Sequence, residues 1–389
     1  MTKENKLLIV VSAILIIGAI ITGYAQTWSD TTAPGGNYEC VGVSANGMII
    51  IAASSDLTLA ISTNYGSTWN TSKSITSLSN AFSILTSSAN GAKWAATFHS
   101  APDYIYVSTN SGQSWAPTAS PSSSQWEALA SSADGSVLAA AIYNGTIYCS
   151  TNSGFSWQPS GVTSKEWEAL SMSADGTRIM AAANGDSIYA LTNSGGTWTW
   201  GMTGASNDSW QSIAGSLDES RLVASSGSGT YVSTNSGANW TLGTNLSGQV
   251  TSSADGSKLA GFNGSVVFFS SDYGNTWVST NWPEAGWFFP KICSSADGNR
   301  LFAVGSGEGI WTCQLNPSGN LNISRMTSSN LMVSWLVPST NFVLQQSSDL
   351  AMAPWSDVTN LPVLNFTNLQ NQVTLPSPGG AAFYRLSTQ

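Results

Sequence analysis

An eight-residue phrase, Ser-Thr-Asn-Ser-Gly-x-x-Trp, recurs six times with small variations along this chain of 389 residues. The copies end at Trp69, Trp115, Trp157, Trp198, Trp240 and Trp277. A second phrase, Ser-Ala-Asp/Asn-Gly, starts at Ser44, Ser88, Ser132, Ser173, Ser216 (degenerate), Ser253 and Ser295. Both recur at intervals of about 37–46 residues, and self-similarity at such a period indicates a repeat architecture.

The third repeat shows most clearly how one period divides into strands. Residues 126–131, 137–142 and 146–150 alternate in the manner of strands, and turn-forming residues separate them. Asn144-Gly145 makes one of these turns and is typical of a tight hairpin. Trp157 then begins a fourth strand. Four short antiparallel strands in about 40 residues are typical of one blade of a β-propeller.

The turn in the longer phrase has a physical basis. An Asx side chain accepts hydrogen bonds from backbone N–H groups within the turn, and the glycine adopts a φ that other residues avoid. The Asx positions are Asn64, Asn110, Asn152, Asn193, Asn235 and Asp272. Because five of these six are uncharged, we interpret them as structural turn caps and not as ligands of a hard cation such as calcium.

This turn resembles the Asp-box, or BNR, repeat of sialidases, sortilin-type receptors and exported photosystem II assembly factors, over about residues 26–314. The resemblance implies a β-propeller. Seven copies of the shorter phrase but six of the longer one leave the last repeat without a fourth strand. Trp28 lies 41 residues before Trp69, where such a strand is expected. We therefore predict an all-β fold, a seven-bladed propeller at residues 26–314 closed by an N-terminal strand.

The two ends of the chain differ from the repeats. A basic start, an apolar run at residues 7–21 and the small Ala25 predict a signal peptide at residues 1–25. The alternative is an uncleaved anchor, although the run is shorter than the roughly 20 residues that span a bilayer. Cleavage predicts a secreted, periplasmic or cell-surface monomer without a membrane span. After a linker at residues 315–320, residues 321–389 predict a small β-sandwich that resembles fibronectin-like modules.

Charge and cysteine content exclude several functions. The formal net charge is −9 with only 8% charged residues, and no basic cluster indicates nucleic-acid or anionic-membrane binding. One histidine, His99, argues against a histidine-built metal site, and we expect no metal or cofactor. Cys40 and Cys293 fall on first strands of the first and last repeats, which a closed ring makes neighbours. They are the one pair aligned for a disulfide, because Cys149 and Cys313 occupy the same place in different repeats.

A further regularity lies at the start of the first strands, on the face opposite the Asx turns, and only the sixth repeat, with Ser247, lacks it. Aromatic residues stand there at Tyr38, Phe82, Trp126, Trp167, Trp210 and Phe289, and Glu39, Glu127, Glu168 and Gln211 follow four of them. These residues either form an aromatic and acidic ring around the mouth of the central channel or wedge between adjacent blades. More acids map to this face, at Asp103, Glu166, Asp186, Asp208, Glu284 and Glu308, with Lys73, Lys165 and Lys291 as its few cations.

The arginines separate this chain from sialidases, which grip a substrate carboxylate with three of them. Its five arginines are Arg178, Arg221 and Arg300 on turns of the opposite face, and Arg325 and Arg385 near the C-terminus. We therefore predict an exported non-catalytic protein that recognises a protein or an extracellular polysaccharide on its acidic, aromatic face. The alternative is a glycoside hydrolase that uses two carboxylates of that face.

Overall fold

A computed structural model describes residues 28–73, 83–97, 104–122, 125–263, 266–281, 291–305, 308–314, 322–326, 330–336, 342–348, 354–365, 370–376 and 382–388. Every regular element in these ranges is a β-strand, as the repeat pattern predicts. No helix in this part of the chain is able to cross a membrane. Phe82, His99, Asp103, Glu284 and Phe289, singled out from the sequence, lie outside the described residues.

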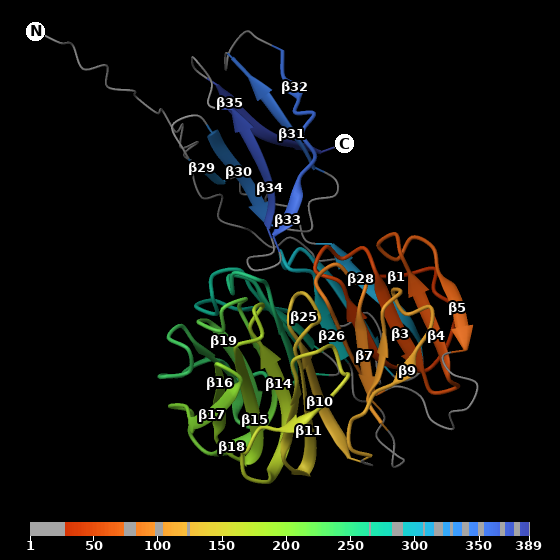
Figure 1. Cartoon of the computed structure of the whole chain (residues 1–389), viewed down its shortest axis with the longest axis vertical. Coiled ribbons are helices and arrows are strands. Elements are labelled where there is room, and N and C mark those ends of the chain that lie inside the picture. Colours follow the sequence, from red (N-terminus) through yellow and green to blue (C-terminus); the bar gives the residue numbers. More distant parts are fainter. Residues whose placement is uncertain are drawn as a thin grey trace, which may run out of the picture.

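The strands of each repeat form a four-stranded antiparallel sheet, the sheets lie side by side, and short pairings also join the third, fourth and fifth of them (Figure 1). The first three contain β2 (Tyr38–Val43), β3 (Ile50–Ser54), β4 (Thr58–Ser62) and β5 (Asn70–Lys73); β6 (Ile84–Ser87), β7 (Trp94–Thr97), β8 (Tyr106–Ser108) and β9 (Ala116–Pro117); and β10 (Trp126–Ser131), β11 (Leu138–Gly145), β12 (Ile147–Ser150) and β13 (Gln158–Pro159). The next three contain β14 (Lys165–Met172), β15 (Arg178–Asp186), β16 (Ile188–Ser194) and β17 (Thr197–Met202); β18 (Asp208–Gly215), β19 (Leu222–Ser226), β20 (Gly229–Ser233) and β21 (Thr241–Thr244); and β22 (Gln249–Ser252), β23 (Leu259–Phe262), β24 (Val266–Ser270) and β25 (Val278–Asn281).

The seventh sheet joins the two ends of the repeat region. It contains β26 (Lys291–Ser294), β27 (Arg300–Gly305), β28 (Glu308–Gln314) and, as its outer strand, β1 (Trp28–Asp30). Trp28 pairs with Cys313 and Asp30 with Trp311. The predicted pairing of the N-terminal strand with the last repeat is thus observed, and it covers an edge that would otherwise be open.

The C-terminal strands form two smaller antiparallel sheets. One contains β29 (Asn322–Arg325), β30 (Asn330–Leu336), β33 (Val363–Asn365) and β34 (Gln370–Pro376), and the other contains β31 (Phe342–Ser347), β32 (Ser356–Asp357) and β35 (Phe383–Thr388). Val333, Trp335, Val373 and Leu375 of the first sheet pack with Leu344 of the second in one buried cluster. Two sheets that share one apolar core are the arrangement of a sandwich.

A ring of backbone hydrogen bonds joins the seven turns that follow the first strands. The N–H of Ala45 donates to the C=O of Ala89, and the ring continues through Ala133, Ala174, Leu217, Ala254 and Ala296, whose N–H donates back to Ala45. The N···O distances lie between 2.6 and 2.9 Å. The side chains of these residues pack together in one apolar cluster. The ring therefore explains why the second residue of the shorter phrase is small.

Hydrogen bonds inside the longer phrase match the expected turn in five copies. In each of these, the serine Oγ accepts from the glycine N–H at 2.8–3.0 Å. The side-chain Oδ1 of the Asx residue accepts from the N–H four residues further on at 2.9 Å. The Asx residues concerned are Asn64, Asn110, Asn152, Asn235 and Asp272. They cap the turn as the sequence indicates.

The fourth copy folds differently, although Asn193 Oδ1 still accepts from a backbone N–H of its turn, that of Gly196, at 3.0 Å. Leu191 stands where the other copies have serine, and no hydroxyl is present to accept from the backbone. Instead, β16 and β17 pair as far as Ser194↔Thr197. Gly195 and Gly196, with φ of 61° and 89°, make the two-residue turn between them. Positive φ at both turn residues is the requirement of a type I′ hairpin, which glycine meets without strain.

The fifth first-to-second turn departs from the repeat at two residues, with Leu217 in place of alanine and Glu219 in place of glycine. Glu219, with φ of 55°, occupies the place where the other six turns have a glycine of positive φ. Its carboxyl is fully buried, and Oε1 accepts from Ser171 Oγ of the preceding sheet at 2.6 Å. Burial raises the pKa of Glu219 to about 8. Gly215 leaves room for this carboxyl, because a Cβ there would collide with Glu219 Oε2.

Removal of the indole of Trp28 tests the closing strand. Trp28 is 8% exposed and packs with Val267, Phe269, Trp311 and Cys313. We expect Trp28→Ala to lower the free energy of unfolding by about 3 kcal/mol, because large-to-small changes of buried aromatic residues cost about this much. Chemical denaturation followed by circular dichroism measures it. Ser29→Ala on the exposed position of the same strand is the control, and an equal loss in both variants would contradict the closing role.

Loss of one turn serine tests the hydrogen bonding of the repeated phrase. Ser150 is buried, and its Oγ accepts from the Gly154 N–H at 2.9 Å. We expect Ser150→Ala to lower the free energy of unfolding by about 1–3 kcal/mol, because a buried N–H is left without an acceptor. Thr151→Ala, on the exposed neighbour, should change the midpoint of thermal unfolding little. If the two variants melt alike, the serine bond is not what stabilises the turn.

Candidate functional site at the cavity mouth

A cavity of about 380 Å³ lies between the first strands of the repeat sheets. Its wall consists of residues from β2, β6, β10, β14, β18, β22 and β26, and most of its polar groups are serine and threonine hydroxyls. Glu127, Glu168, Gln211, Gln249 and Lys291 add the longer polar side chains. A second cavity of about 310 Å³ shares the last three of these, so both open at the same end of the strands. We call this end the cavity mouth.

A repeated β-bulge turns the acidic side chains towards this mouth. Glu39, Glu127, Glu168 and Gln211 are each the extra residue at a shift of register between a first strand and its neighbour. In β10, for example, Trp126 pairs with Ile142 and Ala128 with Ala141, so Glu127 has no partner across the ladder. A bulge re-aims the side chains around it. Glu127, Glu168 and Gln211 consequently line the cavity, whereas Glu39 is exposed.

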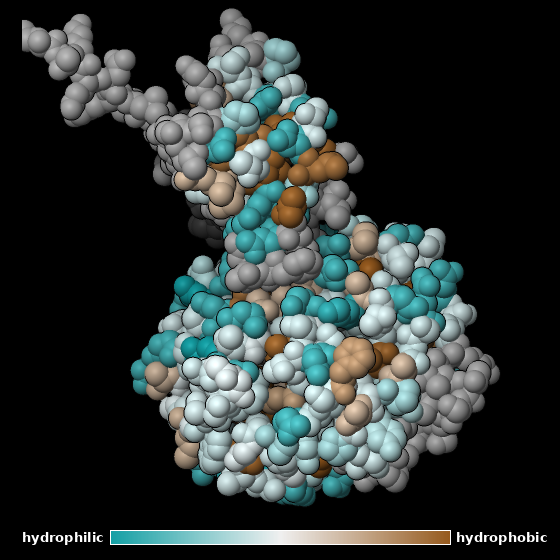
Figure 2. Space-filling view, in the orientation of Figure 1, coloured by the Kyte–Doolittle hydropathy of each residue, from teal (hydrophilic) through white to brown (hydrophobic). Residues whose placement is uncertain are grey.

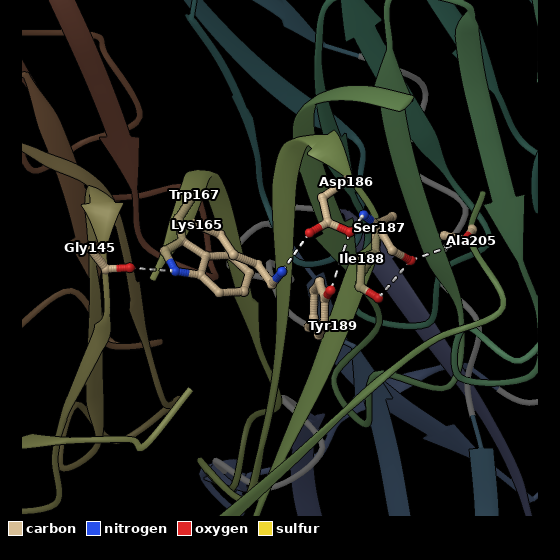
Figure 3. A network of polar contacts seen from close by, with 8 residues as sticks. All are labelled: Gly145, Lys165, Trp167, Asp186, Ser187, Ile188, Tyr189 and Ala205. Carbon is tan, nitrogen blue, oxygen red and sulfur yellow. Dashed lines mark hydrogen bonds and ion pairs between the residues drawn. The ribbon is translucent and has the colours of Figure 1, made fainter. Parts of the chain in front are cut away.

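The aromatic residues before these bulges pack between sheets. Tyr38, Trp126, Trp167 and Trp210 are 0–2% exposed and belong to apolar clusters that join neighbouring sheets. Trp167 of β14, for example, packs on the sheet of β10–β13 and donates from Nε1 to the Gly145 carbonyl at 3.0 Å (Figure 3). This arrangement corresponds to the wedge interpretation. Buried rings present no face on which a ligand is able to stack, so the four described aromatic residues contribute to the site through support.

Gln249 and Lys291 were not among the residues predicted for the ring around the cavity mouth, although both line the cavity. Both are paired regularly, Gln249 with Phe262 and Lys291 with Val304, so their strands have no bulge at this point. They stand one position later in the repeat than Glu127 or Gln211, and the missing bulge brings them to the same cavity. Lys291 was recognised only as a cation of this face. The available signal was the shift of one residue in these two repeats.

The carboxylates of the mouth are coupled to one another. Burial and the charges of Glu127 and Glu166 together raise the pKa of Glu168 to about 7, and the charge of Lys291 opposes them. Burial also raises the pKa of Glu127, again opposed by Lys291. Asn184 Nδ2 donates to Glu166 Oε2 at 3.0 Å and holds this third carboxylate beside the pair. One cation therefore faces three carboxylates, and a further positive group at the mouth would favour their charged form.

The neighbouring ion pair is satisfied within the protein. Lys165 Nζ donates to Asp186 Oδ2 at 2.5 Å, and Tyr189 Oη donates to Asp186 Oδ1 at 3.2 Å (Figure 3). The hydrogen bond from Lys165 lowers the pKa of Asp186. Asp208 accepts from Ser226 Oγ and from the Ser209 N–H, both at 2.7 Å. These two acids stabilise loops at the same end of the sheets and leave the cavity to Glu127 and Glu168.

The cysteines of the closing repeats also reach the cavity. Cys40 and Cys293 both line its wall, and both are thiols in the structure. Burial raises the pKa of Cys40 to about 12. Burial also raises the pKa of Cys293. The charge of Cys40 raises it as well, because the two groups lie close together. In the described ranges, no three His, Cys, Asp or Glu side chains gather in a metal-binding group.

Four-stranded sheets around a central cavity, closed by the N-terminal strand, define a β-propeller. The chain is similar to the structure of YCF48 bound to D1 peptide, with 16% identity and a TM-score of 0.56, over 76% of this chain and 97% of that one. It is also similar to YCF48 from Cyanidioschyzon merolae, with 15% identity and a TM-score of 0.52, over 74% and 98%. No protein-family model and no curated protein matches the sequence. The likeness shows the fold.

The raised pKa of Glu168 predicts a pH-dependent contribution to stability. Between its ordinary pKa of 4.5 and about 7, the folded protein holds a proton that the unfolded chain releases. Stability due to this group therefore falls as pH rises through that window and stays low above it. We expect Glu168→Gln to raise the thermal midpoint more at pH 8 than at pH 5, measured by scanning calorimetry. Gln211→Ala, which removes no titrating group, should give a shift independent of pH; the same pattern for Glu168→Gln would contradict the coupling.

Proposed function

We propose that this protein is a binding propeller that holds a segment of another protein at the cavity mouth, with a cationic side chain of the partner beside Glu127 and Glu168. The observation that carries the proposal is the imbalance of charge in the cavity: Glu127 and Glu168 line it with one lysine, and the charge of Glu166 acts on Glu168 as well. A lysine or arginine of the partner would lower the pKa of Glu168 and form charge-assisted hydrogen bonds. The net charge of −9 favours a basic partner by steering.

The comparison supports a protein partner. A propeller of similar fold, YCF48, is known in a complex with the D1 peptide. A polysaccharide partner has less support, because the aromatic residues that would stack on sugar rings are buried between sheets. We further propose that the repeat sheets are the seven blades of an Asp-box propeller and that the protein is exported, on the strength of the repeated turns and of the sequence of residues 1–25.

A glycoside hydrolase is the second candidate, and one observation favours it. Two carboxylates in one cavity whose environments differ are the arrangement that produces one acid and one base. Here burial raises the pKa of both groups, to about 7 for Glu168, on which the charges of Glu127 and Glu166 also act. Catalysis would need a sugar ring to reach between the two groups. Binding requires only that a cationic side chain reach the mouth.

Peptide selection tests the proposed function. A phage-displayed random peptide library is panned on the protein, and the best binder is resynthesised with each Lys or Arg replaced in turn by Gln. We expect one such replacement to weaken binding about tenfold or more, the loss of roughly one charge-assisted hydrogen bond. Glu127→Gln with Glu168→Gln should cause a similar loss, and Lys291→Gln should tighten binding. Fluorescence anisotropy measures all of these affinities.

The design separates the two candidates. The proposal would be contradicted if the selected peptides lacked basic residues, or if the Glu127 and Glu168 substitutions did not change their affinity. Turnover of bound oligosaccharides on a glycan array, abolished by Glu168→Gln alone, would establish the hydrolase instead. Ser252→Ala, on a hydroxyl of the same wall, is the matched control and should leave peptide affinity unchanged.

A further inference from the structure

The outer strand of the fourth repeat sheet is unusually long. β17 has six residues, whereas β5, β21 and β25 have four, β1 has three, and β9 and β13 have two. β9 and β13 each end in a proline, which protects an edge from pairing. The length of β17 follows from the Gly195-Gly196 hairpin that replaces the usual turn. Figure 1 shows β17 at the outside of the propeller.

The open side of β17 is free of the usual protective devices. Its ladder with β16 runs from Ser194↔Thr197 to Tyr189↔Met202 without a shift of register. In a two-residue hairpin the pair beside the turn is hydrogen-bonded and the pairs then alternate. The backbone N–H and C=O groups of Trp198, Trp200 and Met202 therefore point away from β16. The strand carries no charge, and within the described chain it pairs with β16 alone.

Apolar side chains accompany these backbone groups. Trp200 is 40% exposed and Met202 is 61% exposed, and both lie on one face of the strand. The ring of Trp200 lies 5.8 Å from that of Tyr189, which contacts the buried Trp167 at 5.5 Å. The exposed tryptophan is thus held by the core of its sheet. The visible propeller surface is otherwise mostly pale to teal, with few apolar residues (Figure 2).

We propose that β17 is a second binding site, which takes an extended, uncharged segment of another protein as an added β-strand with apolar side chains beside Trp200 and Met202. Main-chain hydrogen bonds give affinity in this mode, and alternate side chains give specificity. A second copy of this chain fits less well. The edge is about 20 Å long and a sheet is about 10 Å thick, on the order of 200 Å² per copy, against roughly 800 Å² in a stable interface. Two copies of net charge −9 would also repel.

The test uses a labelled peptide, Gly-Ser-Val-Thr-Val-Thr-Val-Thr-Gly-Ser, with capped termini and therefore no charge. We expect saturable binding to the full chain by fluorescence anisotropy. The same peptide with alternate amides N-methylated, which removes its donors, should bind about tenfold or more weakly. Thr199→Lys with Gly201→Lys should cause a similar loss, because lysines on an edge oppose strand addition. Gly201 has open space at its Cβ and accepts the change.

Controls separate this site from the cavity mouth and from self-association. Thr241→Lys on the exposed outer strand β21 should bind the peptide as the unchanged protein does. Glu127→Gln with Glu168→Gln should also have no effect, which distinguishes failure here from failure of the proposed function. The proposal would be overturned if the peptide showed no saturable binding, or if it bound equally well with and without N-methylation. A dimer in analytical ultracentrifugation that the two lysines abolish would assign the edge to a second copy and overturn it as well.

Discussion

The backbone ring that runs from Ala45 through Ala296 and returns to Ala45 ties every repeat sheet to both of its neighbours. Each turn contributes one donor and one acceptor, so a sheet that left its place would leave buried polar groups without partners. The ring also brings seven side chains together in one apolar cluster, and six of the seven are alanine, with Leu217 as the exception. The shorter repeated phrase therefore marks, in the sequence, the turns that form this ring. The pairing of β1 with β28 completes the same closure at the outer edge.

The opposite end of the first strands has a different repeated device. A bulge after Tyr38, Trp126, Trp167 and Trp210 lets the aromatic ring pack between sheets while the following polar side chain is free to turn away from it. Adjacent residues of one strand thus have different roles: the aromatic residue supports the packing of the sheets, and the polar residue is available for the binding that we propose. The strands without a bulge, β22 and β26, add the amide of Gln249 and the ammonium of Lys291 to the same cavity. Variation between repeats, and not the repeat itself, gives the mouth its charge pattern.

The sequence predicted the all-β class, the four strands of each repeat and the pairing of Trp28 with the last repeat, because all of these depend on spacing alone. It left the aromatic residues undecided, since alternation with period two does not reveal a bulge, and a bulge decides which way each side chain points. It did not reveal the longer hairpin at Asn193, because the spacing from Asx to Trp is the same in all six copies. The hydroxyl that Leu191 lacks, together with the second glycine of the pair, decides the fold of that turn.

The departures from the repeat lie in the fourth to seventh sheets. Leu191 and the Gly195-Gly196 pair lengthen β17, Glu219 replaces a glycine, and Lys291 brings the cation to the mouth. Glu219 shows that such a departure is accommodated by its surroundings, because Gly215 and Ser171 Oγ make a place for a carboxyl with a pKa of about 8. At neutral pH this group is mostly protonated, which avoids a buried charge. A ring whose sheets needed only to pair with one another would have no use for these changes. Departures from local rules collect where a protein does something besides fold, and here two of them produce the open edge of β17 and the cation of the cavity mouth.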